Sequence, residues 1–174
     1  IESAIPPKTR AIMAVHVNGR LCQMEAIKKI ADKHNLLIFE DAAQALGAHV
    51  NNYFAGQMSE WAAFSFYPSK TLGCFGDAGG LVTNKYELYQ TVNSMRNHGA
   101  TPDKKIPIDT NIWGTNARLD NVHAAVLSYK ADSYSTSIAR RREIAQRYND
   151  ALSKFPDANL PPAPNAEQNQ FDVF

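Results

Sequence analysis

The chain has 174 residues, of which 44% are hydrophobic and 20% are charged, as is typical of a globular domain with a sizeable core. Its formal net charge of +1 gives no electrostatic basis for binding nucleic acid or an anionic membrane. Cys22 and Cys74 are the only cysteines, which argues against a zinc site or a disulfide framework. We therefore expect a cytoplasmic protein without a metal.

The first predicted elements form a strand–helix–strand unit. The apolar run at 11–17 predicts a buried parallel strand, and the Asn18–Gly19 pair after it predicts a turn. Apolar residues recur at helical spacing over 24–34, and the short apolar run at 36–39 predicts the next strand. This order predicts a βαβ unit within an α/β fold.

Acidic and amide side chains follow the second strand. Ligands in open α/β sheets bind beyond the carboxyl ends of the strands, and Asp41 stands at such an end. The alternative role for Asp41 is that of a helix N-cap. Residues 47–54 then predict a small hairpin, with its turn at Asn51–Asn52.

The segment around Lys70 carries the clearest chemistry. Residues 61–66 predict a short buried strand that Pro68 ends, so Lys70 lies just past a strand end. Hydroxyl groups at Ser65, Ser69 and Thr71 suit a phosphate, and a lysine with a lowered pKa can bond to a carbonyl carbon. A lysine beside a phosphate site is what pyridoxal phosphate requires, whereas an isolated loop lysine is usually only solvated.

Further elements complete the chain. We expect a strand at 79–84, a helix at 87–97, and a long polar loop at 100–116 of a length that usually has a functional or interfacial role. The helix predicted at 119–129 is too apolar to face water, so it is buried either in its own subunit or against a partner.

The C-terminal part begins with an amphipathic helix predicted at 133–155, whose arginine cluster is more often a solvated face than a binding site. A Pro-rich linker follows at 161–164, and residues 171–174 resemble the start of a strand. We therefore divide the chain into 1–133, part of a large domain, and 134–174, a connecting helix and the start of a small domain.

Asp41, Gln44, Ser65 and Lys70 together are more specific than any one of them. With their surroundings, they make the sequence resemble the nucleotide-sugar aminotransferases of the DegT/DnrJ/EryC1/StrS family. The matching stretches run in the family's order and cover nearly the whole chain: Val15–Gly19, Glu40–Gln44, Ser65–Lys70, Gly76–Gly80, Arg96–Gly99 and Gly114–Asp120.

The resemblance implies the large domain of a fold-type I pyridoxal-phosphate transferase, with a mostly parallel sheet flanked by helices. Lys70 would form the Schiff base with pyridoxal 5'-phosphate, and Asp41 would bind its pyridine nitrogen. Gln44 would contact the cofactor's 3-oxygen and Ser65 its phosphate. Asn116 would reach the phosphate of the neighbouring subunit's cofactor, which implies a homodimer with shared active sites.

The same resemblance implies the transfer of an amino group from an amino acid, with glutamate the expected donor, to a nucleotide-linked keto sugar. Arg96 and His98 lie in a motif near the substrate region. Family members are longer at both ends and this chain lacks an initiator Met, so we expect a central fragment of the enzyme. The alternatives are a sugar dehydratase of the same family, which carries histidine where Lys70 stands, and a non-catalytic α/β ligand-binding or interaction domain.

Overall fold

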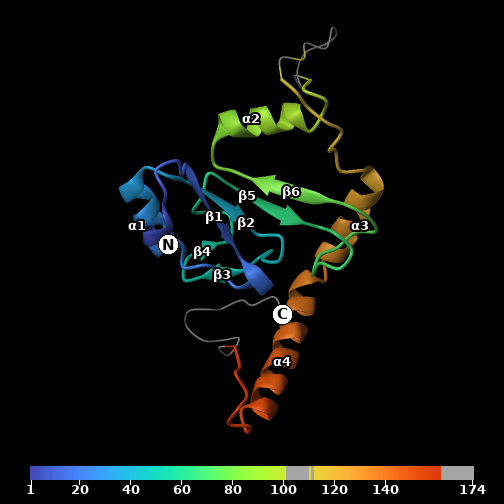
Figure 1. The fold of residues 1–174 in the computed structure, drawn as a ribbon. Helices are drawn as coiled ribbons and strands as arrows, with labels where there is room; N and C mark the ends of the chain where they lie inside the picture. Colours follow the sequence, from blue (N-terminus) through green and yellow to red (C-terminus); the bar gives the residue numbers. More distant parts are fainter. Residues whose placement is uncertain (101–109, 111, 162–174) are drawn as a thin grey trace.

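A four-stranded sheet of strand order β1-β2-β5-β6 forms the centre of the computed structural model, which describes residues 1–100, 110 and 112–161 (Figure 1). Strands β1, β2 and β5 are parallel, and helices flank the sheet, so the predicted α/β class is confirmed. The strands are β1 (Ala11–Val15), β2 (Leu37–Asp41), β3 (His49–Val50), β4 (Tyr53–Phe54), β5 (Trp61–Ser65) and β6 (Gly79–Val82). The helices are α1 (Met24–His34), α2 (Tyr86–Met95), α3 (Asn121–Ala131) and α4 (Tyr134–Leu152), with short 3-10 turns η1 (Glu2–Ala4) and η2 (Val17–Gly19).

The β1–α1–β2 unit forms as the sequence predicts. Helix α1 buries Met24, Ile27 and Ala31, which lie at the expected helical spacing. Asn35 ends the helix in the left-handed conformation, with φ of 53°, and its backbone N–H donates to carbonyls of the last turn. The helix returns the chain so that β2 pairs in parallel with β1.

Strand β6 runs antiparallel to β5, because the chain reverses through residues 66–78. Ser65 pairs with Gly79 at the closed end of this reversal. A Cβ atom at Gly79 would lie 2.8 Å from the Phe64 carbonyl oxygen, so glycine allows the close approach of the two strands. The small hairpin is also confirmed, with β3 and β4 joined through Asn51 in the left-handed conformation.

One face of the sheet carries the core. Side chains alternate between faces along a strand, and the paired residues Ala14, Glu40 and Ala62 are all buried on the same face. Helix α1 covers β1 and β2 on that face, and Ile138 of α4 packs there in a second cluster rich in alanines. On the opposite face Met13 is 58% exposed. Asp41 and Ser65 alternate with the buried residues, so they belong to this open face.

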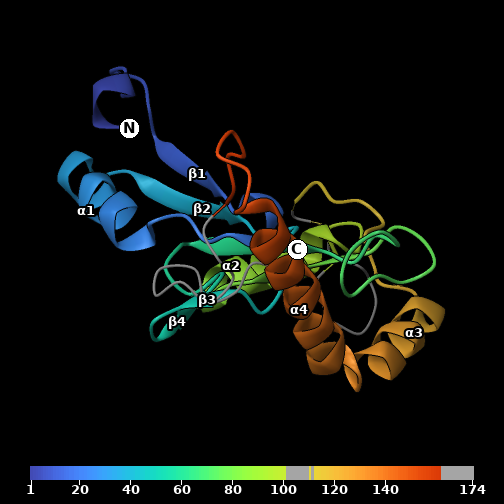
Figure 2. The same cartoon turned by 90° about the horizontal axis from the view of Figure 1, so that it is seen from below.

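Helix α3 begins two residues later than predicted, and α4 spans 134–152 of the predicted 133–155. Only Leu127 of α3 is buried, whereas Val122 and Tyr129 are 69% and 82% exposed. The described part of the chain therefore does not bury this apolar helix. Figures 1 and 2 show α4 continuing from α3 after a bend, with its C-terminal half projecting away from the sheet.

Within the described ranges, no helix is long and apolar enough to cross a membrane. The same residues contain no group of three or more His, Cys, Asp or Glu side chains that could hold a metal ion. The strand expected at 171–174 and most of the loop expected at 100–116 lie outside the described residues.

Candidate functional site

Asp41 is the last residue of β2, and its carboxylate is oriented by the turn that follows. Its Oδ1 accepts a hydrogen bond from the backbone N–H of Ala43 at 3.0 Å. No helix begins here, so Asp41 caps a turn and is not a helix N-cap. The side chain is half-buried on the open face, and the turn does not use its second oxygen, Oδ2.

Gln44 joins this turn to the one that follows β1. Its Oε1 accepts the backbone N–H of Asn18 at 2.7 Å, and Asn18, in the predicted Asn18–Gly19 turn, has the left-handed conformation. Because the amide oxygen is the acceptor, the Nε2 amide group is oriented away from Asn18 and can donate.

Ser65 ends β5, and its hydroxyl oxygen accepts the backbone N–H of Tyr67 at 3.3 Å. A hydroxyl that accepts in this way retains its own hydrogen for donation. Asp41, Gln44 and Ser65 are thus each oriented by one backbone N–H, which is local for Asp41 and Ser65 and comes from the turn after β1 for Gln44. Each side chain retains a different polar group: an anionic oxygen, an amide donor and a hydroxyl donor.

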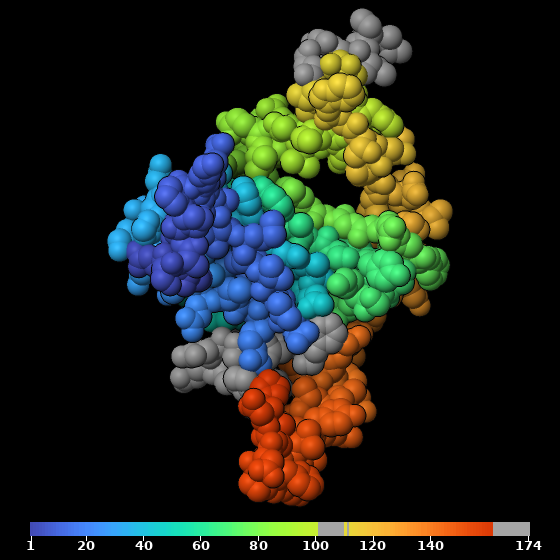
Figure 3. Space-filling model, in the orientation of Figure 1, coloured from blue at the N-terminus to red at the C-terminus, as the bar shows by residue number. Residues whose placement is uncertain are grey.

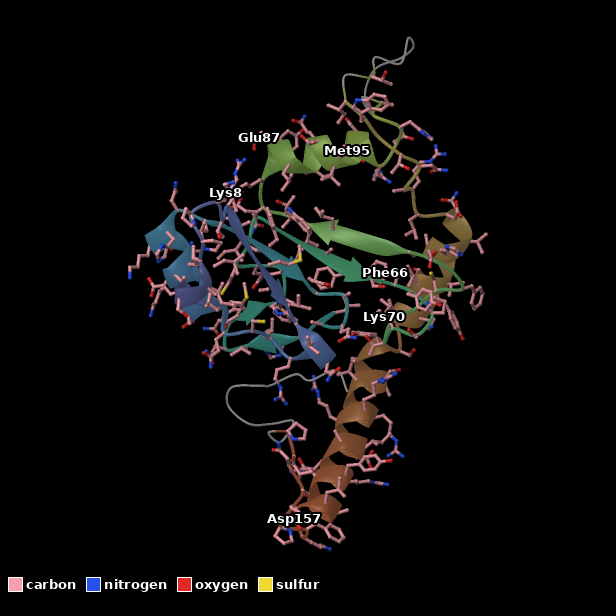
Figure 4. All side chains as sticks on the ribbon, viewed as in Figure 1. Lys8, Phe66, Lys70, Glu87, Met95 and Asp157 are labelled. Carbon is pink, nitrogen blue, oxygen red and sulfur yellow. The ribbon has the colours of Figure 1, made fainter. Side chains whose placement is uncertain are left out.

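Lys70 is half-buried in the loop between β5 and β6, in a turn closed by its own N–H and the Tyr67 carbonyl oxygen at 2.8 Å. We call residues 66–78 the lysine loop. Figure 4 shows Lys70 beyond the carboxyl end of β5, near the junction of α3 and α4. Two backbone hydrogen bonds close the lysine loop, from Phe66 N–H to the Ala78 oxygen at 2.8 Å and from Cys74 N–H to the Phe66 oxygen at 2.9 Å.

Side chains from α3 and α4 hold the lysine loop from outside. Lys130 Nζ donates to the Gly73 carbonyl oxygen. Tyr134 donates to the Leu46 carbonyl oxygen at 2.8 Å, and its hydroxyl lies 3.2 Å from that of Thr71. Tyr134 therefore links the lysine loop to the loop that begins with Asp41 and Gln44. The sequence did not lead us to Lys130 or Tyr134, because both contacts join residues more than fifty positions apart.

Asn116 contacts a different part of the chain. It forms a bridge with Asn97, and its Oδ1 accepts from Arg118 Nε at 3.2 Å. Figure 1 shows residues 112–120 running beside the C-terminal end of α2, beyond the β6 edge of the sheet. Asp41, Gln44, Ser65 and Lys70 instead follow the carboxyl ends of β2 and β5. The described chain does not bring Asn116 to that group.

Arg96 and His98 lie beside Asn116 and also away from the strand ends. Arg96 Nε donates to Asn93 Oδ1 at 2.8 Å, and the His98 N–H donates to the Thr115 carbonyl oxygen at 3.0 Å. Arg96 lines a groove of about 880 Å³ between β6 and α2, which opens to the surface in Figure 3. The groove is lined by apolar and aromatic residues together with polar ones such as Asn84, Lys85 and Asn93.

A buried hydrogen-bonded pair lies behind Asp41, on the covered face of the sheet. His16 Nε2 is 2.8 Å from Glu40 Oε2, and both side chains are at most 1% exposed. The Cys22 N–H donates to His16 Nδ1 at 3.2 Å, so Nδ1 carries a lone pair and the ring proton is on Nε2. Burial acts to raise the pKa of Glu40, but hydrogen bonds from His16 and the Gly56 N–H outweigh it, and the pKa lies below its ordinary 4.5.

The sequence analysis did not select His16 or Glu40. The available signal was an ionisable residue within or at the end of each apolar strand, at 11–17 and 36–39.

A mostly parallel sheet that presents a carboxylate, an amide, a hydroxyl and a lysine beyond its carboxyl ends has the layout of a ligand-binding α/β protein. Comparison with known proteins specifies the family. All 174 residues match the model of the DegT/DnrJ/EryC1/StrS aminotransferase family.

Individual relatives agree with this match. The chain is 38% identical over 177 residues to dTDP-3-amino-3,4,6-trideoxy-alpha-D-glucose transaminase of Micromonospora megalomicea subsp. nigra, covering 100% of this chain and 46% of that protein. DesV of S. venezuelae, crystallised in complex with a ketimine intermediate, aligns with a TM-score of 0.81 at 40% identity, over 92% of this chain and 43% of that one. NtdA from Bacillus subtilis with bound cofactor PMP aligns at 0.85 and 29% identity, over 99% of this chain and 39% of that one.

The chain therefore belongs to the DegT/DnrJ/EryC1/StrS aminotransferase family. It spans less than half the length of the curated relatives it matches.

Proposed function

We propose that the protein containing this chain is a pyridoxal-phosphate-dependent aminotransferase that acts on a nucleotide-linked keto sugar. Family membership supports an aminotransferase, and the relative from Micromonospora is named as a transaminase of a dTDP-linked sugar. Lys70 occupies the position where dehydratases of the same family carry histidine, which favours amino transfer. Glutamate is the proposed amino donor.

The observation that carries the proposal is the set of polar groups left by Asp41, Gln44 and Ser65. When bound, pyridoxal phosphate supplies an electron sink that stabilises negative charge at the carbon losing a proton. Asp41 Oδ2 can accept a hydrogen bond from a protonated pyridine nitrogen, and as an anion it keeps that nitrogen protonated. Gln44 Nε2 can donate to the 3-oxygen, and the Ser65 hydroxyl can donate to the phosphate.

Lys70 completes this group as the covalent anchor and the proton carrier. Its Nζ is carried by the loop that follows β5, the strand that Ser65 ends. The amine can bond to the carbonyl carbon of the cofactor, and once displaced by the amino substrate it can accept and return a proton at Nζ. The links from Lys130 and Tyr134 to the lysine loop limit the movement of that amine.

The roles that we propose for the remaining site residues involve a second subunit or the substrate. We assign Asn116 to the cofactor phosphate of a neighbouring subunit in a homodimer, and Arg96 and His98 to the substrate region. The separation of Asn116 from the strand ends within one chain, and the exposed apolar face of α3, support this arrangement. We also retain the division into a large domain over 1–133 and a connecting helix and small domain from 134, in a cytoplasmic enzyme.

The direct test uses the full-length protein that contains this chain. The purified protein should bind pyridoxal phosphate with a visible absorption band, and borohydride should fix the cofactor to the peptide containing Lys70. With glutamate, it should convert a nucleotide-linked keto sugar to the amino sugar, measured by mass spectrometry. Absence of cofactor binding by the folded protein would refute the proposal and favour a non-catalytic α/β domain.

A further inference from the structure

The buried pair of His16 and Glu40 has no role in the chemistry described above, yet it lies at the carboxyl ends of β1 and β2. His16 is hydrogen-bonded to the last two residues of β2, Glu40 and Asp41. Its ring donates to Glu40, and its backbone N–H donates to the Asp41 carbonyl oxygen at 3.0 Å. The backbone of Asp41 is therefore fixed from β1 at the same point where its carboxylate reaches the open face.

The pair also fixes the segments on either side. The Cys22 N–H donates to the His16 ring, and this hydrogen bond closes the 16–22 turn. The turn includes Asn18, whose N–H donates to Gln44. Glu40 Oε2 additionally accepts the Gly56 N–H at 2.7 Å. One buried contact thus joins the turn that orients Gln44, the strand end that carries Asp41, and the hairpin beneath them.

Stability alone is a weak explanation for this arrangement. Taking a carboxylate out of water costs free energy that one or two hydrogen bonds rarely recover, and apolar replacements of buried polar pairs can be as stable. Glu40 Oε1 is moreover buried without a hydrogen-bond partner among the described residues. A buried group left partly unsatisfied calls for an explanation, and a fixed position next to a functional residue is one.

We propose that His16 and Glu40 are positioning residues, which set the positions of Asp41 and Gln44 for the cofactor ring through the last residues of β2 and the 16–22 turn. The inference rests on the proposed function. It predicts that breaking the pair weakens cofactor binding more than it weakens the fold.

The experiment measures three quantities on the full-length protein: the Kd of pyridoxal phosphate for the cofactor-free protein, the position of the visible band of the bound cofactor, and the thermal unfolding of the cofactor-free protein. The variants are Glu40→Ala, Glu40→Asp and Glu40→Gln. The matched control is Ile27→Ala, a buried core residue of α1 that clusters with Ala14 and Ile38 and not with the His16–Glu40 pair.

We expect Glu40→Ala to raise the Kd by roughly tenfold or more and to shift the band, because small misplacements of binding groups are costly. Glu40→Asp keeps the charge but withdraws it from His16, and it should show the same changes if the Ala variant does not fold. Glu40→Gln can still accept from His16 and Gly56 and should restore most of the affinity. Ile27→Ala should lower the unfolding temperature and leave the Kd within about twofold of wild type.

Two results would overturn this inference but not the proposed function. In the first, folded Glu40→Ala and Glu40→Asp proteins keep the wild-type Kd and band position. In the second, Ile27→Ala loses as much affinity as Glu40→Ala. A wild-type protein that binds no pyridoxal phosphate would overturn the proposed function and this inference with it.

Discussion

Tyr134 at the start of α4 and Thr71 in the lysine loop share a hydrogen bond, with 3.2 Å between their hydroxyl oxygens. Tyr134 also donates to the carbonyl oxygen of Leu46 at 2.8 Å. Burial raises the pKa of Tyr134 above its ordinary value, so the hydroxyl keeps its proton at neutral pH. One phenol therefore connects the loops that carry Lys70 and Gln44.

Replacing this phenol tests the connection. Tyr134→Phe keeps the ring in its packed position and removes both hydrogen bonds, which should lower the free energy of unfolding by about 1 kcal/mol. Because the lysine loop loses a link to the Gln44 loop, the Kd for pyridoxal phosphate should rise as well. Chemical denaturation and a cofactor titration measure the two effects. Tyr148→Phe, also on α4 but 66% exposed, should change neither.

Lys70→Ala tests the covalent role of the lysine. The variant should fold normally, since the hydrogen bond that Lys70 makes within the described residues is a local backbone one that alanine retains. It should lose turnover and the borohydride-fixed cofactor, as shown by peptide mass spectrometry. Lys28→Ala, which removes an exposed ion pair on α1, is the matched control and should retain both. A cofactor adduct that persists on another lysine of the Ala variant would show that Lys70 is the wrong residue.

Asp41→Asn separates the structural and chemical roles of that side chain. The amide oxygen can still accept the Ala43 N–H, so the turn and the unfolding temperature should be nearly unchanged. Without a negative charge, the side chain cannot hold the pyridine nitrogen in its protonated form, and kcat should fall by about two orders of magnitude or more. Near-normal kcat combined with a lower unfolding temperature would instead mean that Asp41 serves mainly to cap the turn.

Acid stability should depend on Glu40. Its pKa in the folded protein lies below the ordinary 4.5, so between these values the unfolded chain binds a proton that the folded protein does not. The contribution of Glu40 is therefore complete above the unfolded pKa and is lost as the pH falls through the folded one. Glu40→Gln should flatten this part of the curve of unfolding temperature against pH. Glu25→Gln on the exposed side of α1 should leave its slope unchanged.

Local patterns predicted the elements well where one signal determined each boundary. The apolar spacing at 24–34 predicted α1 to the residue. In the structure the left-handed Asn35 ends the helix, so the boundary is set by the sequence next to it. The direction of β6 could not be predicted in this way. It depends on how residues 66–78 fold back, and that path rests on Lys130 and Tyr134, which are distant in sequence.

In the site, too, the residues next to strand ends could be predicted from the sequence, whereas contacts between distant residues could not. Asp41 and Lys70 were visible because each follows a strand, and strand ends are where α/β proteins bind ligands. Their supports were not visible. The His16–Glu40 contact joins residues 24 positions apart on two strands, and only the parallel register of β1 and β2 brings them together.

The last prediction concerns the assembly. Around Asn116 the described chain leaves large apolar side chains in solvent, with Trp113 96% exposed and Tyr129 and Val122 of α3 82% and 69% exposed. Helices of this composition are normally covered, and in a homodimer a second copy would cover this one. We therefore expect Asn116 to serve the cofactor phosphate of the partner subunit.

Mixing two inactive full-length variants, Lys70→Ala and Asn116→Asp, tests this directly under conditions of subunit exchange. If Asn116 acts across the interface, one site of each heterodimer has lost both residues and the other has lost neither. Equal mixing should then restore about a quarter of wild-type activity, because half the dimers are mixed and each has one intact site. If Asn116 serves its own subunit, every site in the mixture has lost one residue, and activity should stay absent even where native mass spectrometry shows that exchange has occurred.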